Sequence, residues 1–138
     1  MAQEVTILKR EGNAMILERE LEFRGSRGRE KLITLFDSGS TSSCISPERA
    51  EALEQSLSLS EPIEVETAGK GAFIHITRAT RLDFYLNSLR LTDEFMIVPG
   101  LSEDAIIGAT ALQKWKIKLD FEHDQIITDP RAAKLKLI

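Results

Sequence analysis

The chain of 138 residues is poor in the residue types that stabilise small exported domains or bind structural zinc. It has one cysteine and two histidines, too few for an internal disulfide or for a zinc site of thiolates and imidazoles. No run approaches the roughly 18 consecutive apolar residues of a membrane-spanning helix. Residues 1–13 also lack the basic and then apolar pattern of a secretion signal. We therefore expect a cytoplasmic protein with no membrane association.

Neither sign of charge is in large excess. The chain carries 18 Lys and Arg residues against 22 Asp and Glu residues, a formal charge of −4 at pH 7. Proteins that bind nucleic-acid phosphates usually carry a basic excess, so we expect no nucleic-acid partner. The length suits one core, which predicts a single domain over residues 1–129. The basic tail 130–138 alternates lysine with leucine, and we expect either an edge or dimer-interface strand or a disordered end.

Short apolar runs between turn signals predict a mostly β domain rather than a helical bundle. In the run 15–23, Glu18, Glu20 and Glu22 alternate with apolar residues, as in a strand with one buried face. The expected strands cover residues 5–8, 15–23, 31–36, 61–67, 72–80, 81–86, 89–92, 95–98, 117–121 and 125–128; of these, residues 5–8 are the first strand-like run. Between two of them, residues 68–71 predict a glycine-rich hairpin tip.

Two short helices interrupt the predicted strands. The first should begin after Ser46, which is a favourable N-cap residue, with Pro47 at the first helical position. The second is predicted over residues 109–114, with Leu112 and Trp115 as its apolar anchors.

An acidic residue at the end of an apolar strand is the sharpest chemical feature of the sequence. Asp37 follows the run 31–36 and is itself followed by Ser38, Gly39, Ser40 and Thr41. A carboxylate in a low-dielectric cleft can hold an unusual protonation state, glycine permits close backbone packing, and hydroxyls can donate hydrogen bonds to the acid. The alternative from this motif alone is a hydroxyl-rich turn that merely ends a strand.

A second motif follows about 70 residues later. Ile106, Ile107 and Gly108 precede the second predicted helix and the alternating strand 117–121. In this order, and with the hairpin between them, the two motifs resemble the retropepsin-like aspartic proteases, the single-domain relatives of pepsin. The resemblance covers residues 31–121.

The resemblance implies a closed β-barrel with one or two short helices and the activity of an aspartic endopeptidase. It implies that Asp37 is the catalytic aspartate, that Ser38 makes hydroxyl contacts between two active-site loops, and that Gly39 contacts substrate through its backbone. It also implies that the segment 106–108 crosses beneath the active site. The flap that closes over an extended peptide would be formed by Ala68, Gly69, Lys70, Gly71 and Ala72.

If the enzyme interpretation is right, the chain must act as a homodimer. Aspartic proteolysis needs two carboxylates that share one proton and hold a water molecule. No other aspartate of the chain is followed by a hydroxyl residue and glycine, so the second carboxylate should be Asp37 of a twofold mate. The mechanism needs no metal and no other cofactor.

Two positions depart from the retroviral pattern of this family. Retroviral members usually have an acid where this chain has Thr41 and an arginine where it has Ala109. In retroviral members this acid and this arginine form an ion pair. Both are absent here, which indicates a cellular or bacterial type of relative. We also expect the Ser40 hydroxyl to donate a hydrogen bond to the outer oxygen of Asp37.

Two other functions remain open. A catalytically inactive module of the same fold would dimerise or bind a peptide and keep Asp37 for turn geometry. A thiol hydrolase would use Cys44 with His75 or His123 as its base. No residue pattern places a base beside Cys44, so a buried structural thiol is the preferred interpretation of this residue.

Overall fold

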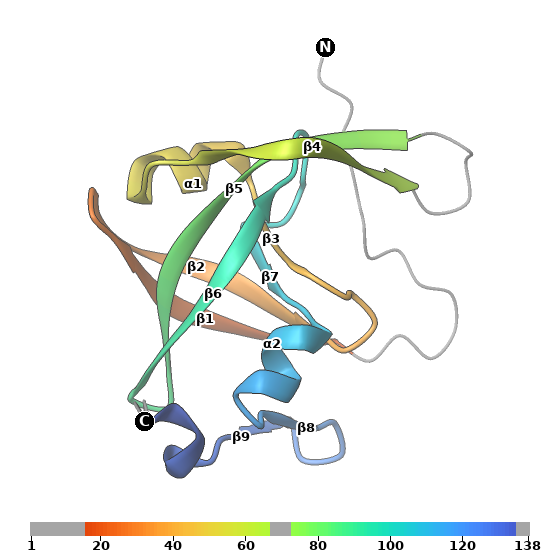
Figure 1. Ribbon diagram of the computed structural model, residues 1–138. Helices are drawn as coiled ribbons and strands as arrows, with labels where there is room; N and C mark the ends of the chain where they lie inside the picture. The colour runs from red at the N-terminus through yellow and green to blue at the C-terminus, as the bar shows by residue number, and fades with distance from the viewer. Residues whose placement is uncertain (1–15, 67–72, 135–138) are drawn as a thin grey trace.

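The structure is a computed structural model that describes residues 16–66 and 73–134 (Figure 1). None of the helices in these ranges is long and apolar enough to cross a bilayer. The strands are β1 (Ile16–Gly25), β2 (Gly28–Asp37), β3 (Ser43–Ile45), β4 (Leu57–Glu66), β5 (Phe73–Leu86), β6 (Leu89–Ile97), β7 (Ala105–Ile107), β8 (Lys118–Asp120) and β9 (Gln125–Ile127). The helices are α1 (Pro47–Leu53), α2 (Ala109–Lys114) and the 3-10 helix η1 (Pro130–Ala133).

Six of the described strands form a closed barrel. Their hydrogen-bonded order is β1-β2-β7-β3-β6-β5, and β1 pairs again with β5 to complete the ring. Strand β4 extends the sheet beyond β5, and Figure 1 shows this β4–β5 hairpin projecting past the barrel. Helix α1 lies towards one end of the barrel and α2 towards the other. The predicted mostly β closed barrel with two short helices is confirmed.

The alternation predicted for the strand 15–23 is present. Leu17, Leu21 and Phe23 are buried, while Glu18 and Glu20 between them are exposed. Successive side chains of a strand point to opposite faces, so one face of β1 turns into the barrel and the other into solvent. Strand β2 pairs with β1 along its whole length in an antiparallel register that joins Ile16 to Asp37 and Gly25 to Gly28.

Three phenylalanines form the centre of the barrel. Phe23, Phe84 and Phe95 are fully buried, with ring centroids 5.5 to 6.1 Å apart. Two of these pairs meet edge to face, which aromatic rings favour over direct stacking. A second apolar cluster lies nearer the β4–β5 hairpin and contains Cys44, Ile76, Val98, Leu101 and Ile106.

Both predicted helices occur, and one detail of the first differs. Helix α1 begins with Pro47 at its start, as expected, and buries Ala50 and Leu53. Ser46 occupies the N-cap position with extended backbone angles, but its side chain makes no capping hydrogen bond. Its own N–H donates to the carbonyl of Asp104 instead, so the entry to α1 is fixed by tertiary contact rather than by a local cap.

Strands β5 and β6 are longer than the separate runs that the sequence predicts. The expected strands 72–80 and 81–86 are one strand, because outward-facing Arg81 lies between buried Thr80 and Leu82 without breaking the alternation. The two residues between the expected strands 81–86 and 89–92, Asn87 and Ser88, form the turn between β5 and β6, with φ angles of 50° and 66°. Two consecutive positive φ angles are typical of the tightest β-hairpin turns.

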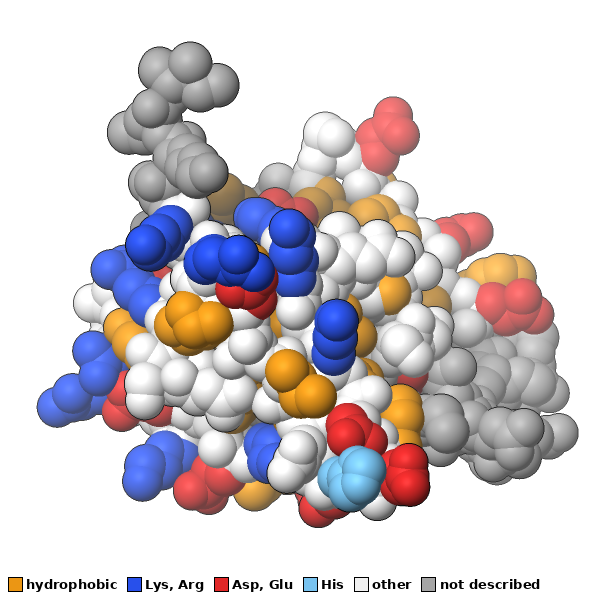
Figure 2. Space-filling view, turned by 90° about the horizontal axis from the view of Figure 1, so that it is seen from below, with side chains coloured by type: hydrophobic (Ala, Val, Ile, Leu, Met, Phe, Trp, Pro, Cys, Tyr) orange, Lys and Arg blue, Asp and Glu red, His pale blue; other side chains and the backbone are white. Residues whose placement is uncertain are grey.

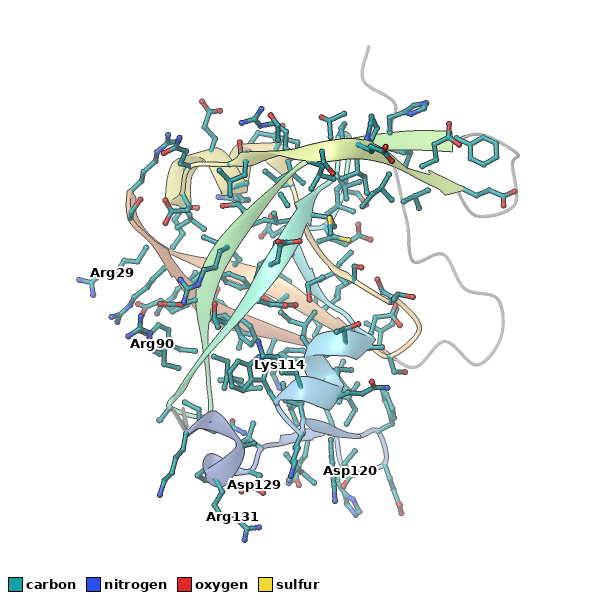
Figure 3. The ribbon with its side chains drawn as sticks, viewed as in Figure 1. Arg29, Arg90, Lys114, Asp120, Asp129 and Arg131 are labelled. Atoms are coloured by element: carbon teal, nitrogen blue, oxygen red, sulfur yellow. The ribbon has the colours of Figure 1, made fainter. Side chains whose placement is uncertain are left out.

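The segment after α2 forms a small separate layer below the barrel. Strands β8 and β9 pair only with each other among the described residues. Residues 130–133 of the predicted tail form η1 rather than a strand; Pro130 lies at the start of this helix, and the Asp129 carboxylate accepts a hydrogen bond from the Arg131 N–H. Figure 3 shows Asp129 and Arg131 together at this end. Residues 135–138, which hold most of the lysine and leucine alternation, lie outside the described residues.

Candidate active site

The barrel topology places the two sequence motifs next to each other. Strands β2 and β7 are parallel neighbours, with Leu35 opposite Ile106 and Phe36 opposite Ile107. Asp37 follows Phe36 and Gly108 follows Ile107, so the two segments leave this pair of strands at the same point. Asp37 is only 1% exposed. A carboxylate separated by about 70 residues from the glycine segment therefore lies beside it at the end of the same pair of strands.

The backbone of the loop after β2 holds the carboxylate in place. The Gly39 N–H donates to Oδ1 of Asp37 over 2.8 Å, and the Ser40 N–H donates to the Asp37 carbonyl over 3.2 Å. The Ser40 hydroxyl, however, donates to the carbonyl of Ser42 at 2.9 Å. The expected hydrogen bond from the Ser40 hydroxyl to the outer oxygen of Asp37 is therefore wrong: this side chain turns back and stabilises its own loop.

Hydrogen bonds join this loop to the start of α2. The Ala109 N–H donates to the Ser40 carbonyl at 2.6 Å, and both the N–H and the hydroxyl of Thr110 donate to the Thr41 carbonyl at 3.2 and 3.0 Å. The first N–H groups of a helix have no partner within the helix, and loop carbonyls satisfy them here. These bonds join Ser40 and Thr41 of the loop to Ala109 and Thr110 at the start of α2.

Gly108 is required by the close approach of the two segments. A Cβ atom at this position would lie 2.5 Å from the Ser42 carbonyl oxygen and 2.7 Å from that of Ser40. The Gly108 N–H donates to the Ser43 hydroxyl at 3.1 Å. Ser43 was not singled out from the sequence, although it ends the hydroxyl-rich run that begins at Ser40.

Beside the Asp37 loop lies a cavity of about 300 Å³. The loop residues Gly39 to Ser42 line one part of it, and the β4–β5 hairpin lines another. The remaining lining residues are Cys44, Ile63, Val65, Glu66, Ile76 and Met96. Ile63 and Met96 belong to predicted strands, but which face of a strand turns to the cavity depends on pairing partners far away in the sequence.

The other predicted site residues divide into two groups. Ser38, Gly39 and Thr41 are exposed on the loop, while Ser40, Ile106, Ile107 and Gly108 are buried beneath it. The predicted flap residues, Ala68 to Ala72, lie outside the described residues.

Cys44 lies below the loop as a buried thiol. It is 4% exposed, and its sulfur lies 3.7 Å from the Ser42 carbonyl. Burial, together with the negative charge of Glu103, raises the pKa of the Cys44 thiol to about 12. The two histidines pair elsewhere, His75 with Glu64 and His123 with Asp120. A protonated thiol without an adjacent base does not fit a nucleophilic role.

Across residues 16–66 and 73–134, no three His, Cys, Asp or Glu side chains are grouped as a metal site would require. The chemistry that these residues offer is that of a buried carboxylate, backbone N–H groups and an adjoining apolar cavity.

Comparison with known proteins finds a family and similar solved structures. A family model described as aspartyl protease matches residues 22–111. The crystal structure of the retroviral protease-like domain of Ddi1 from Leishmania major is similar in fold, with a TM-score of 0.52, 17% sequence identity, and coverage of 86% of this chain and 89% of that chain. At this identity the structural match concerns the fold alone.

Proposed function

The chain belongs to the aspartyl protease family, whose model matches more than half of its length, and on this premise we propose that it is an aspartic endopeptidase active as a homodimer. The observation that carries the proposal is the position of Asp37. This carboxylate is buried at the end of β2 and receives a hydrogen bond from the Gly39 N–H, and the loop that follows it lines a cavity together with residues of the β4–β5 hairpin.

Peptide hydrolysis by this route needs a second carboxylate. In the proposed mechanism, the ionised Asp37 takes a proton from a shared water molecule as the water attacks the scissile carbonyl. The protonated Asp37 of the mate donates a hydrogen bond to the carbonyl oxygen, where negative charge develops. The exposure of Ser38 and Gly39 supports this arrangement, because it leaves the outer side of the loop open to a second copy.

We propose that the mate docks at a second cavity. It has a volume of about 560 Å³, reaches Ser38 on the active-site loop, and is otherwise lined by α2 and the strand that follows it. Its apolar residues are Ala109, Leu112, Ile117, Leu119 and Phe121. Figure 2 views the molecule from this lower end and shows hydrophobic side chains interspersed with charged ones. An apolar centre with a polar rim is typical of protein interfaces.

The test is cleavage of a diverse peptide mixture, with the cut bonds identified by mass spectrometry. We expect cleavage in the range from about pH 4 to about pH 7, where a carboxylate pair can share one proton. Asp37→Asn keeps the shape of the side chain but cannot ionise, so cleavage should fall by a factor of about a thousand or more.

The matched control is Asp124→Asn, which makes the same chemical change at a carboxylate that is 76% exposed in the turn between β8 and β9. This variant should cut like the natural chain. If neither the natural chain nor Asp124→Asn cuts any peptide although both are folded and dimeric, the endopeptidase proposal fails. The chain is then an inactive binding module of the same fold.

A further inference from the structure

A third cavity lies at the end of the barrel that carries α1 (Figure 1). It has a volume of about 370 Å³ and is lined by residues of the β1–β2 turn, α1, the connection from α1 to β4, β5 and β6. None of these residues lines the cavity beside the Asp37 loop or the cavity at α2. The proposed reaction does not use this cavity, which is therefore a candidate for a separate site.

One part of the cavity is apolar. Pro47, Ala50 and Glu51 of α1 all line it, and their spacing of three and four residues is that of side chains on one helix face. Ala50 is 2% exposed. Ile97 also lines the cavity and pairs with Ile45, which lies two residues before Pro47. The start of α1 and the end of β6 thus form an apolar floor, and Glu51 lies one helical turn further along.

Two arginines line the cavity, and neutral groups hold both of them. The Arg27 guanidinium donates to the Glu51 carbonyl at 3.0 Å. The Arg78 guanidinium donates to the hydroxyls of Ser56 and Ser58 at 2.6 and 2.9 Å and to the Ser56 carbonyl at 3.0 Å. Among the described residues, neither guanidinium forms an ion pair with a carboxylate. A guanidinium offers several N–H donors in a planar fork that matches a carboxylate, so both arginines keep charge and donors for a bound anion.

Two acidic residues line the cavity as well, and they differ in their contacts. The Glu54 carboxylate accepts hydrogen bonds from the Ser26 N–H at 2.7 Å, from the Gln55 N–H at 2.9 Å and from the Ser26 hydroxyl. The Ser26 hydroxyl makes the largest contribution to lowering the pKa of this carboxyl, so Glu54 is ionised and already engaged. The Glu51 carboxylate is exposed and has no partner in the part of the chain that the structure describes. Glu51 is therefore the acid available to a bound cation.

Charge and volume together define the ligand. Two arginines and two glutamates give no net charge, so a simple anion such as phosphate would be repelled by Glu51 and Glu54. A neutral apolar molecule would bury the charged groups without giving them partners. A small molecule with a carboxylate, an ammonium group and an apolar part satisfies the arginines, Glu51 and the apolar floor. At about 370 Å³, near the lower end of the range for small-molecule sites, the cavity suits one amino acid rather than a nucleotide.

From these observations we propose that the cavity binds a free, zwitterionic α-amino acid with an apolar side chain. Arg27 and Arg78 bind its carboxylate, Glu51 binds its ammonium group, and the apolar floor contacts its side chain. Charge-assisted hydrogen bonds are stronger than neutral ones, and here they distinguish the free amino acid from a residue inside a peptide chain, which carries neither charge. The proposal does not rest on the endopeptidase activity.

NMR of the arginine Nε–H groups provides the first test. Arg78→Lys identifies the Arg78 signal by its loss, and L-leucine should shift this signal in a saturable way. Leucinamide lacks the carboxylate and should bind about tenfold more weakly. N-acetyl-leucine lacks the ammonium group and should bind about threefold more weakly. No saturable shift at up to about 10 mM leucine, or equal affinities for the three compounds, would overturn the proposal.

Substitution of Arg78 provides the second test, with the Arg27 signal as the readout. Arg78→Gln should weaken leucine binding about tenfold. The matched control is Arg81→Gln on the same strand, because Arg81 is 65% exposed and pairs with Asp83 instead of lining the cavity. This control should bind leucine like the natural chain. Equal leucine affinities of the two variants would contradict the assignment of the carboxylate to Arg78.

A third test separates the two charged ends of the ligand. Glu51→Gln should weaken leucine binding about threefold, as expected for an exposed ion pair, and should leave N-acetyl-leucine binding unchanged. Arg27→Gln, in an exposed turn, tests the carboxylate contact if Arg78→Gln does not fold; it should weaken leucine binding and leave leucinamide binding unchanged. Equal weakening of leucine and N-acetyl-leucine by Glu51→Gln would overturn the zwitterion. These assays involve no cleavage, so their failure leaves the endopeptidase proposal standing.

Discussion

Asp37 and Cys44 show two ways in which this chain accommodates a buried ionisable side chain. The carboxylate of Asp37 accepts a hydrogen bond from the Gly39 N–H, a group whose position is set by the loop itself. The thiol of Cys44 has only a long contact to the Ser42 carbonyl and lies among apolar residues. Buried polar groups are costly unless they are hydrogen-bonded, so a carboxylate needs the donor while a neutral thiol does not.

The alkaline stability of the protein should depend on Cys44. Its pKa rises from an ordinary value of 9.0 to about 12 in the folded chain. Below about pH 9 the thiol is protonated in both the folded and the unfolded states, and this stabilising contribution is complete. Between about pH 9 and about pH 12 only the unfolded chain releases the proton. The free energy of unfolding should therefore fall by up to about 1.4 kcal/mol per pH unit.

Urea unfolding of the natural chain and of Cys44→Ala, each at about pH 8 and about pH 10, measures this contribution. The loss of stability between the two pH values should be about 1 kcal/mol larger in the natural chain. The cavity that alanine leaves lowers stability equally at both pH values and cancels in the comparison. Parallel losses in the two proteins would contradict the assignment of a raised pKa to Cys44.

At the scale of elements, the parallel neighbours β2 and β7 create the site. Each strand ends in a segment that continues away from the sheet, and the start of α2 donates its free N–H groups to the Asp37 loop. Gly108 makes this possible because the carbonyls of Ser40 and Ser42 occupy the space of a side chain. The position of the acid thus depends on a glycine in a different part of the sequence.

Substituting Gly108 by alanine should separate the two segments. The added Cβ would meet the Ser42 carbonyl oxygen at 2.5 Å, and backbone cannot yield as a flexible side chain can. Such overpacking typically costs about 1–3 kcal/mol. We expect thermal unfolding at lower temperature and, in a cleavage assay at a temperature where the variant is folded, a loss of activity.

Gly28→Ala is the matched control for Gly108→Ala. Gly28 lies in the β1–β2 turn, where an added Cβ has no atom within 4 Å, although its φ of 159° limits how well alanine fits. The Gly28→Ala variant should retain full cleavage activity when it is folded. Equal activity of the two variants would show that close packing at Gly108 is not needed by the site.

The features that sequence predicts well are those that neighbouring residues determine. The helix after Ser46, the hairpin at Asn87 and Ser88, and an acid at the end of an apolar strand depend on local propensities. The predicted hydrogen bond from the Ser40 hydroxyl to Asp37 was wrong because a hydroxyl in a tight loop has several acceptors within reach. The Ser40 hydroxyl donates to the Ser42 carbonyl of the same loop. The cavity residues Ile63 and Met96 were missed because strand pairing sets their orientation.

At the scale of the whole molecule, the pairing that closes the barrel leaves other surfaces for assembly. The pairing of β1 with β5 satisfies edges that would otherwise be open. Helix α2 and strand β8 lie outside the barrel and line the cavity that reaches Ser38. The chain has one motif aspartate, and this apolar surface lies next to the loop that carries it. We therefore expect two copies to assemble.

Mixing experiments test that assembly through the activity itself. If each active site needs Asp37 from two chains, an Asp37→Asn chain that pairs with a natural chain removes that site. With random pairing, roughly one quarter of the dimers in an equal mixture keep both carboxylates. With the amount of natural chain held fixed, an equal amount of Asp37→Asn protein, refolded together with it, should therefore about halve the activity.

Asp37→Asn combined with Phe121→Asp at the proposed interface should inhibit much less, because an uncompensated charge opposes docking. Activity that is unchanged by Asp37→Asn protein at any ratio would mean that one chain forms a complete site.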